Sequence, residues 1–333
     1  MEKILTISNP PIRGYQFFAY QLSVICTSPD FSHWLNSHFI QLFCNPLEPV
    51  VQFYEPYIRY ETNPWFKFER LSNETINELE LDLNIIIKSY IDRGFYILSI
   101  VDEYYIPNRT SYQKFSNIHD LLIYGYNQKE KTYVTIGYDD SSNYRTQRVR
   151  FENFERSLFS NSDNYIIPFA LKGDFTYGFN IENIIVLLND YLCSKDTSEN
   201  LRQLDERQYQ PDHVFGIETY RCLENYFELL IKKKAPFDIR SLHFLCEHKE
   251  SMITRINFLV NNGYLINGYD SDYIIKGLQN IKNQCNIAKN LQMKFFLTNN
   301  PNEVVKIIKI INDVSEKERA ILTKLLDCLN KFK

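Results

Sequence analysis

Two residues near the middle of the chain, His119 and Asp139, have the side chains that general acid and base catalysis uses. Each lies at one end of a short apolar run, and residues 127–131, NQKEK, join the two runs. In an antiparallel hairpin, the first residue of one strand lies beside the last residue of its partner. A carboxylate at that position fixes the tautomer of an imidazole and stabilises its charged form. The spacing therefore predicts a His119–Asp139 pair.

A reading without catalysis explains the same two residues. A lone histidine before a strand is commonly a loop residue, and Asp139 begins a polar stretch, DDSSN, of the kind that forms turns. The pair thus stands as a hypothesis that needs the surrounding elements to support it.

The elements that must position the pair are strands, and the first half of the chain contains suitable runs. Short segments rich in β-branched and aromatic residues predict strands at residues 94–101, 121–126, 132–138 and 145–151. Capping residues and apolar periodicity predict helices at residues 15–26, 31–43 and 72–93, the first of them apolar on nearly every side. Helices followed by mostly antiparallel strands indicate an α+β domain.

The second half of the chain has a helical period throughout. We expect helices at residues 181–192, 217–233, 238–261, 271–297 and 302–332, and a surface loop within residues 196–210. The sequence therefore predicts two domains, an α+β domain over residues 1–175 and an all-helical domain over residues 180–333.

Composition excludes several classes of function. The 333 residues include 37 basic and 41 acidic side chains, a net charge of −4, which leaves no basic excess for nucleic acid or for acidic membranes. No apolar run approaches the roughly 18 to 20 residues of a membrane span, and the first residues lack the pattern of a signal peptide. We therefore expect a cytoplasmic protein.

Cofactor motifs are also missing from the sequence. The 7 cysteines are widely spaced, with no CxxC pattern and no Cys/His pair at metal-ligand spacing, so neither disulfides nor structural zinc are expected. Neither GxxxxGK[ST] nor GxGxxG occurs, which argues against a nucleotide cofactor. The chemistry that we predict uses no metal and no cofactor.

The stretch around the pair resembles a known family. The phrase NIHDLLIYGYN followed by YVTIGYD resembles papain-like cysteine proteases, in which a histidine precedes one apolar strand and an aspartate follows the next. It is similar to the branch named after the N-terminal domain of a butirosin biosynthesis protein, and ILSIVDEYYIP at residues 97–107 resembles another phrase of that branch. The resemblance covers roughly residues 10–175 and implies a papain-like core.

The family uses a cysteine at the start of its central buried helix, where unpaired N–H groups and the helix dipole activate a thiol and hold an oxyanion. Here that position falls on Ala19, and Gln16 is the expected oxyanion donor. Alanine cannot attack a carbonyl. Three explanations stay open: the protein is naturally inactive at this step, the chain is an engineered Cys-to-Ala variant, or Cys26, two residues before the predicted helix cap Ser28, is the nucleophile.

The resemblance implies acyl transfer and not proteolysis. Relatives form amides in thiotemplated natural-product assembly, including that of closthioamide, by passing an acyl group from a carrier-protein thioester through an enzyme cysteine to an amine. The expected partners are an acyl or peptidyl carrier protein, which presents the acyl group on a phosphopantetheine arm, and a small amine. A thiolate activated by His119 and supported by Asp139 would form the acyl-enzyme. The alternatives are a cysteine hydrolase, either a protease or a thioesterase, and a non-catalytic binding protein on a papain-like scaffold.

Overall fold

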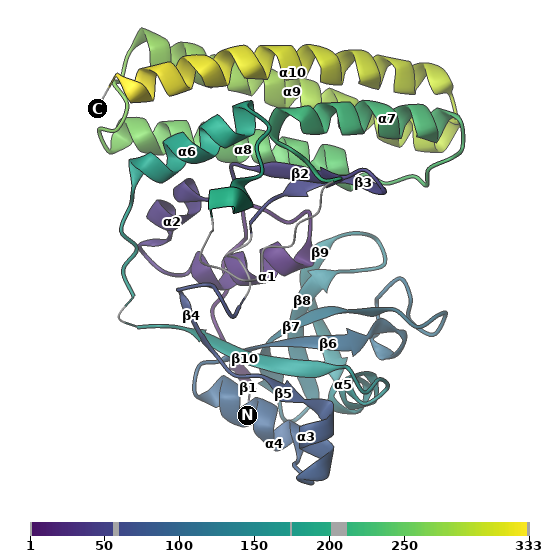
Figure 1. Cartoon of the computed structure of the whole chain (residues 1–333). Helices are drawn as coiled ribbons and strands as arrows, with labels where there is room; N and C mark the ends of the chain where they lie inside the picture. The colour runs from purple at the N-terminus through teal and green to yellow at the C-terminus, as the bar shows by residue number, and fades with distance from the viewer. Residues whose placement is uncertain (1, 56–59, 174, 201–211, 332–333) are drawn as a thin grey trace. The chain divides into compact units, whose positions relative to one another are not determined.

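The computed structural model describes residues 2–55, 60–173, 175–200 and 212–331 (Figure 1). Contacts within the chain divide it into two compact units. Unit 1 comprises Met1–Phe31 and Tyr57–Thr176, and unit 2 comprises Ser32–Pro56 and Tyr177–Lys333. The architecture is α+β, as predicted, with antiparallel sheets and helices in the N-terminal part and a helical region in the C-terminal part.

Unit 1 is built on one antiparallel sheet, with the strand order β4-β10-β6-β7-β8-β9, to which β1 adds beside β7 and β5 beside β10. Its strands are β1 (Glu2–Ile4), β4 (Phe66–Phe68), β5 (Leu71–Ser72), β6 (Tyr96–Asp102), β7 (Ile118–Asn127), β8 (Thr132–Tyr138), β9 (Tyr144–Arg150) and β10 (Tyr165–Leu171). Its helices are α1 (Gln16–Ile25), α3 (Asn73–Glu78), α4 (Leu83–Asp92) and α5 (Phe151–Leu158), with the short 3₁₀ helix η1 (Glu103–Tyr105).

The predicted hairpin is confirmed, and local chemistry explains it. Strands β7 and β8 pair antiparallel with Leu122 opposite Ile136. In the turn, the side chain of Asn127 accepts hydrogen bonds from the N–H groups of Lys129 and Glu130, both at 3.0 Å. An asparagine that bonds the main chain two and three residues ahead closes such a turn by itself. This turn fixes the register of the strand that carries His119.

Three predicted boundaries in the first half are wrong. The helix expected at residues 72–93 is divided into α3 and α4, because Glu80 adopts a positive φ of 49° and Asp82 caps a new helix through a 3.0 Å bond from the N–H of Ile85. The strand expected at residues 145–151 gives way to α5 at its last residue. The helix expected at residues 31–43 is shorter, since Phe39 has a φ of 59° and a strand follows.

Unit 2 contains the predicted long helices and a small sheet that was not predicted. Its elements are α2 (Phe31–Ser37), β2 (Leu42–Asn45), β3 (Glu48–Phe53), α6 (Ile181–Leu192), η2 (Thr197–Asn200), β11 (Val214–Phe215), η3 (Gly216–Glu218), α7 (Thr219–Ile231), α8 (Arg240–Asn261), α9 (Tyr269–Thr298) and α10 (Pro301–Asn330). Most of the loop expected at residues 196–210 lies outside the described residues. In the part of unit 2 that is described, the sheet has the order β11-β2-β3.

The segment Ser32–Pro56 packs with the C-terminal region, whereas the sequence assigned it to the first domain. Two kinds of contact explain the difference. Strand β2 pairs with β11, and the guanidinium of Arg255 on α8 donates to the carbonyl oxygens of Asn36, at 2.8 Å, and His38 just after α2. An arginine that satisfies carbonyls at a helix end stabilises that end. Neither contact is visible in local sequence pattern.

A buried polar network lies inside unit 2. The ammonium group of Lys249 on α8 contacts Glu318 Oε1 on α10 at 2.5 Å, and the hydroxyls of Tyr191 and Tyr220 donate to Glu318 Oε2 at 3.1 and 2.6 Å. Lys249 also donates to Nδ1 of His248 at 2.8 Å, while Nε2 of that ring bonds a main-chain carbonyl at 2.9 Å. Burial holds the pKa of His248 well below its usual value, which agrees with a neutral ring that accepts at Nδ1.

No helix among residues 2–55, 60–173, 175–200 and 212–331 combines the length and the apolar character that a membrane span requires.

Candidate functional site

Helix α1 and strand β7 bring together side chains that lie more than 100 positions apart. Gln16 is the first residue of α1, and His119 is the second residue of β7. The amide nitrogen of Gln16 lies 3.0 Å from His119 Nδ1 and 3.3 Å from Asp120 Oδ1. The tertiary structure therefore places an imidazole and a carboxylate at the amino end of a buried helix.

His119 and its neighbour Asp120 form the closest contact of this site. Nδ1 of the ring lies 2.6 Å from Asp120 Oδ1, a distance that requires a proton between the two atoms. The hydrogen bond that the ring donates to Asp120 is the main reason that the pKa of His119 rises to about 9, against the opposing effect of burial. At neutral pH the ring is therefore a charged imidazolium that donates from Nδ1 to Asp120, and the Gln16 amide is left to donate to the same carboxylate.

The second ring nitrogen of His119, Nε2, makes no hydrogen bond or ion pair with the described residues. All hydrogen bonds and ion pairs that this side chain makes with the described residues use Nδ1. The side chain is 44% exposed, and in the imidazolium form Nε2 carries a proton that none of these contacts uses. A group of this kind binds a carbonyl oxygen or an anion.

Asp139 is not the partner of His119, and this prediction is corrected. Its Oδ1 accepts hydrogen bonds from the N–H groups of Ser141, at 2.9 Å, and Asn143, at 2.8 Å, while Oδ2 lies 2.5 Å from Nε of Arg145. These donors hold the pKa of Asp139 below its usual value. Strand β8 ends at Tyr138, so the carboxylate turns into the β8–β9 connection, where it acts as the turn residue of the alternative reading.

The side-chain oxygen of Gln16, Oε1, is held by two donors other than His119 and Asp120. It accepts from the N–H of Tyr138 at 2.7 Å and from Nη1 of the buried Arg109 at 3.1 Å. Since both partners are donors, the amide nitrogen must face His119 and Asp120. Gln16 was predicted to donate to an oxyanion, but in this structure its amide nitrogen is already engaged.

Ala19 lies in the first turn of α1, completely buried. Its N–H donates to the carbonyl of Tyr15 at 3.1 Å, and the side chain of Tyr15 gives no capping bond to the helix. A cysteine at position 19 would thus belong to the helix turn that begins with Gln16. The methyl group present there cannot act as a nucleophile.

Cys26 is placed unfavourably for the role of alternative nucleophile. It is the residue that ends α1, at the negative end of the helix dipole, and its N–H donates to Leu22. Burial raises the pKa of its thiol to about 12. Helix α2 begins only at Phe31, so the helix amino end that was expected next to Cys26 is not there. The thiol is therefore protonated and weakly nucleophilic at neutral pH.

The His, Cys, Asp and Glu side chains of the described residues form no metal centre. Within these residues, no group of three or more His, Cys, Asp or Glu side chains is arranged to hold a metal ion. Comparison of the sequence with protein-family models and with curated proteins found no match.

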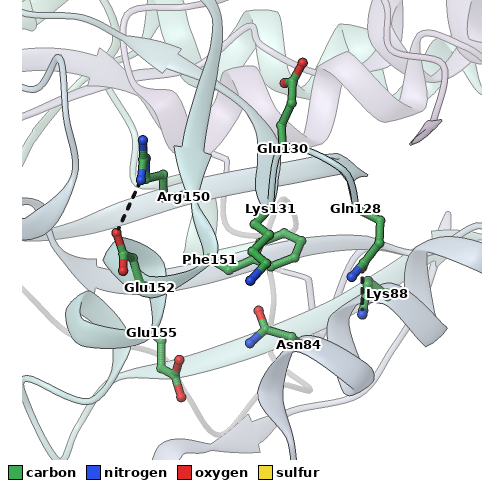
Figure 2. Close-up of a pocket in the computed structure, with 9 residues that line it drawn as sticks. All are labelled: Asn84, Lys88, Gln128, Glu130, Lys131, Arg150, Phe151, Glu152 and Glu155. Atoms are coloured by element: carbon green, nitrogen blue, oxygen red, sulfur yellow. Dashed lines mark hydrogen bonds and ion pairs between the residues drawn. The ribbon is translucent and has the colours of Figure 1, made fainter. Parts of the chain in front are cut away.

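A cavity of about 590 Å³ lies in unit 1 at the turn end of β7 and β8 (Figure 2). His119 lies at the other end of β7. The cavity is lined by Asn84, Lys88, Gln128, Glu130, Lys131, Arg150, Phe151, Glu152 and Glu155. Several of its charges have partners, since Lys88 donates to Gln128 at 2.9 Å and Arg150 lies 3.8 Å from Glu152. The mixed charges indicate no single class of ligand, and we assign this cavity no part in the site.

Sequence reasoning missed Asp120 and Arg109 as members of the site. Asp120 follows His119 directly, and neighbouring residues of a strand point to opposite faces, so the pattern gave no reason to pair them. The two residues meet at the beginning of β7, where His119 is exposed. Arg109 lies in the connection after η1, close in sequence to the phrase DEYYIP, and that proximity was the only available signal.

Proposed function

We propose that the protein binds an acyl thioester, carried on the phosphopantetheine arm of a carrier protein, where Gln16, His119 and Asp120 meet. The observation that carries this proposal is the contact between the first side chain of α1 and the His119–Asp120 pair. It agrees with the frame of the papain-like acyltransferases that the sequence resembles, in which a histidine acts at the amino end of a buried helix.

Two features support recognition of a carbonyl group. The imidazolium of His119 has an Nε2–H that makes no hydrogen bond with the described residues, and its pKa of about 9 keeps it charged at neutral pH. The amino end of α1 adds the positive end of a helix dipole. Both would polarise the carbonyl oxygen of a thioester, which is the group that the reaction of the resembled family attacks.

The side chains at positions 19 and 26 favour binding without an acyl-enzyme. Ala19 has no nucleophile, and the thiol of Cys26, with a pKa of about 12, is unsuited to attack. We therefore assign this chain the binding role on a papain-like scaffold and assign the amide-forming reaction to its Ala19→Cys form. There, a thiolate at position 19 would attack the thioester carbonyl, and the imidazolium of His119 would give its proton to the departing carrier thiolate. An amine would then attack the acyl-enzyme and release the thiolate at position 19, and the neutral ring of His119 would take the proton that the amine loses.

The test compares the unchanged chain with Ala19→Cys and with His119→Gln. Each protein is mixed with an acyl-pantetheine thioester, binding is measured by calorimetry, and acyl loading is measured by intact-protein mass spectrometry. We expect the unchanged chain to bind without gaining mass, Ala19→Cys to gain one acyl group, and His119→Gln to bind at least about tenfold more weakly, because one charged hydrogen bond is lost.

Two results would contradict the proposal. A mass gain in the unchanged chain would show that another side chain is a nucleophile. Equal binding by the unchanged chain and His119→Gln would show that the imidazolium does not contact the ligand. The variant Cys26→Ser serves as a matched control, since we expect it to bind and load like the unchanged chain.

A further inference from the structure

We propose that Glu103 and Arg109 form a buried positioning pair that fixes the amide of Gln16 and thereby holds His119 against Asp120. Neither residue touches the proposed ligand. The role of this pair rests on the proposed function, but the contact between His119 and Asp120 that the pair maintains can be measured without any ligand.

The pair is itself held firmly inside unit 1. Arg109 is 3% exposed, and its Nε lies 3.5 Å from Glu103 Oε1. The other carboxylate oxygen of Glu103 accepts from Oγ of Ser111 at 3.2 Å and from Nδ2 of Asn117 at 2.8 Å. A buried guanidinium needs a charged partner of this kind, and a carboxylate held by two hydrogen bonds and one ion pair cannot easily rotate away.

Arg109 connects the carboxylate of Glu103 to the side chain of Gln16. Its Nη1 donates both to the side-chain oxygen Oε1 of Gln16, at 3.1 Å, and to the main-chain carbonyl of Tyr138. The N–H of Tyr138 donates to the same Gln16 oxygen at 2.7 Å. An amide whose oxygen accepts two donors is locked in one orientation, so its nitrogen faces the His119–Asp120 pair.

Close packing around Gly137 disfavours other orientations of the Gln16 side chain. A Cβ atom at Gly137 would lie 2.5 Å from Gln16 Oε1, 2.6 Å from Arg109 Nη2 and 2.7 Å from the hydroxyl of Tyr20. Three polar side chains thus converge on the one residue of β8 that leaves them room. The hydroxyl of Tyr20 also lies 3.5 Å from the main-chain oxygen of Asp120, which ties the cluster to β7.

Charges alternate along the resulting chain of contacts. The carboxylate of Glu103 is followed by the guanidinium of Arg109, the amide dipole of Gln16, the carboxylate of Asp120 and the imidazolium of His119. Each group stabilises the next, and networks of this kind respond as a unit when one member is removed. Without the fixed amide, the partly exposed ring of His119 would gain freedom to leave Asp120.

The test measures how strongly Asp120 acts on His119. The titration midpoint of His119 is followed by NMR in the unchanged chain, in Asp120→Asn, in Glu103→Gln/Arg109→Met, and in the combination of these three changes. Glu103 also raises the pKa of His119 directly, and this direct effect drops out because Asp120→Asn is compared within each background. Arg109→Lys is the charge-preserving comparison, because lysine keeps the positive charge but loses the fork with which Nε faces Glu103 and Nη1 donates to Gln16.

We expect Asp120→Asn to lower the midpoint from about 9 to 6.5 or below in the unchanged chain. In the double variant the same change should lower it by less than half as much, and in Arg109→Lys, which keeps the charge without the fork, by an amount between these two values. An undiminished effect of Asp120→Asn in a double variant with a native circular dichroism spectrum would overturn the inference. Binding of acyl-pantetheine is measured separately, so that a failure of the proposed function leaves the titration result intact.

Discussion

The fully buried ion pair of unit 2 allows a quantitative prediction. In Glu318→Gln, an amide of nearly the same shape replaces the carboxylate, so packing is preserved while the charge is lost. Lys249, whose side chain is 0% exposed, is then left without its counter-charge, and the hydroxyls of Tyr191 and Tyr220 lose a charged acceptor. Removal of one partner of a buried pair costs about 3 to 5 kcal/mol.

A surface pair on the same helix serves as the matched control. Lys317 lies 2.6 Å from Asp313 on α10, and their side chains are 47% and 44% exposed. Because water screens this pair, Lys317→Gln should cost less than about 1 kcal/mol. The two substitutions lie at neighbouring positions of one helix and differ mainly in burial.

Urea unfolding followed by far-ultraviolet circular dichroism measures the free energy of unfolding of both variants, and thermal unfolding measures their Tm. For a unit of this size, the loss expected for Glu318→Gln corresponds to a fall in Tm of roughly 6 to 20 °C. The combination with Lys249→Met should be less destabilising than the sum of the two single changes, because no uncompensated charge is left inside. Equal losses for Glu318→Gln and Lys317→Gln, or strict additivity of the combination, would refute the reasoning.

Further predictions concern unit 1. Gly137→Ala should lower its free energy of unfolding in urea by about 1 to 3 kcal/mol, because the added methyl group overlaps three polar side chains. Cys26, with a thiol pKa of about 12, should react with iodoacetamide at pH 7.5 far more slowly than the exposed Cys193, as peptide mass spectrometry can measure. The pKa of His119 is higher in the folded chain than its ordinary value of 6.5, so its contribution to stability should be complete below pH 6.5 and should disappear as the pH rises through about 9; urea titrations across that range test this. Asp139→Asn should leave the NMR midpoint of His119 unchanged, and a fall would restore the predicted pair.

Local sequence determined the elements of this protein to a large extent. The helix α1, the hairpin of β7 and β8, and the helices α6 to α10 follow from apolar period, caps and turn residues, which act between neighbours in the chain. The family resemblance predicted that His119 lies near the start of α1, and the ring does lie 3.0 Å from the side chain of Gln16, while its role in a functional site stays a prediction. It also showed that position 19 lacks a nucleophile.

Only the tertiary structure determined which distant side chains and segments contact one another. Gln16 reaches His119 across 103 positions, Arg109 reaches Gln16 across 93, and the segment Ser32–Pro56 joins the C-terminal unit through β11 and Arg255. Asp139 directly follows β8, as predicted from its spacing, yet its carboxylate is bound by donors within its own turn and by Arg145. The physical reason is that a hydrogen bond is satisfied by whichever donor packing brings within about 3 Å, and that choice depends on distant segments which no local pattern describes.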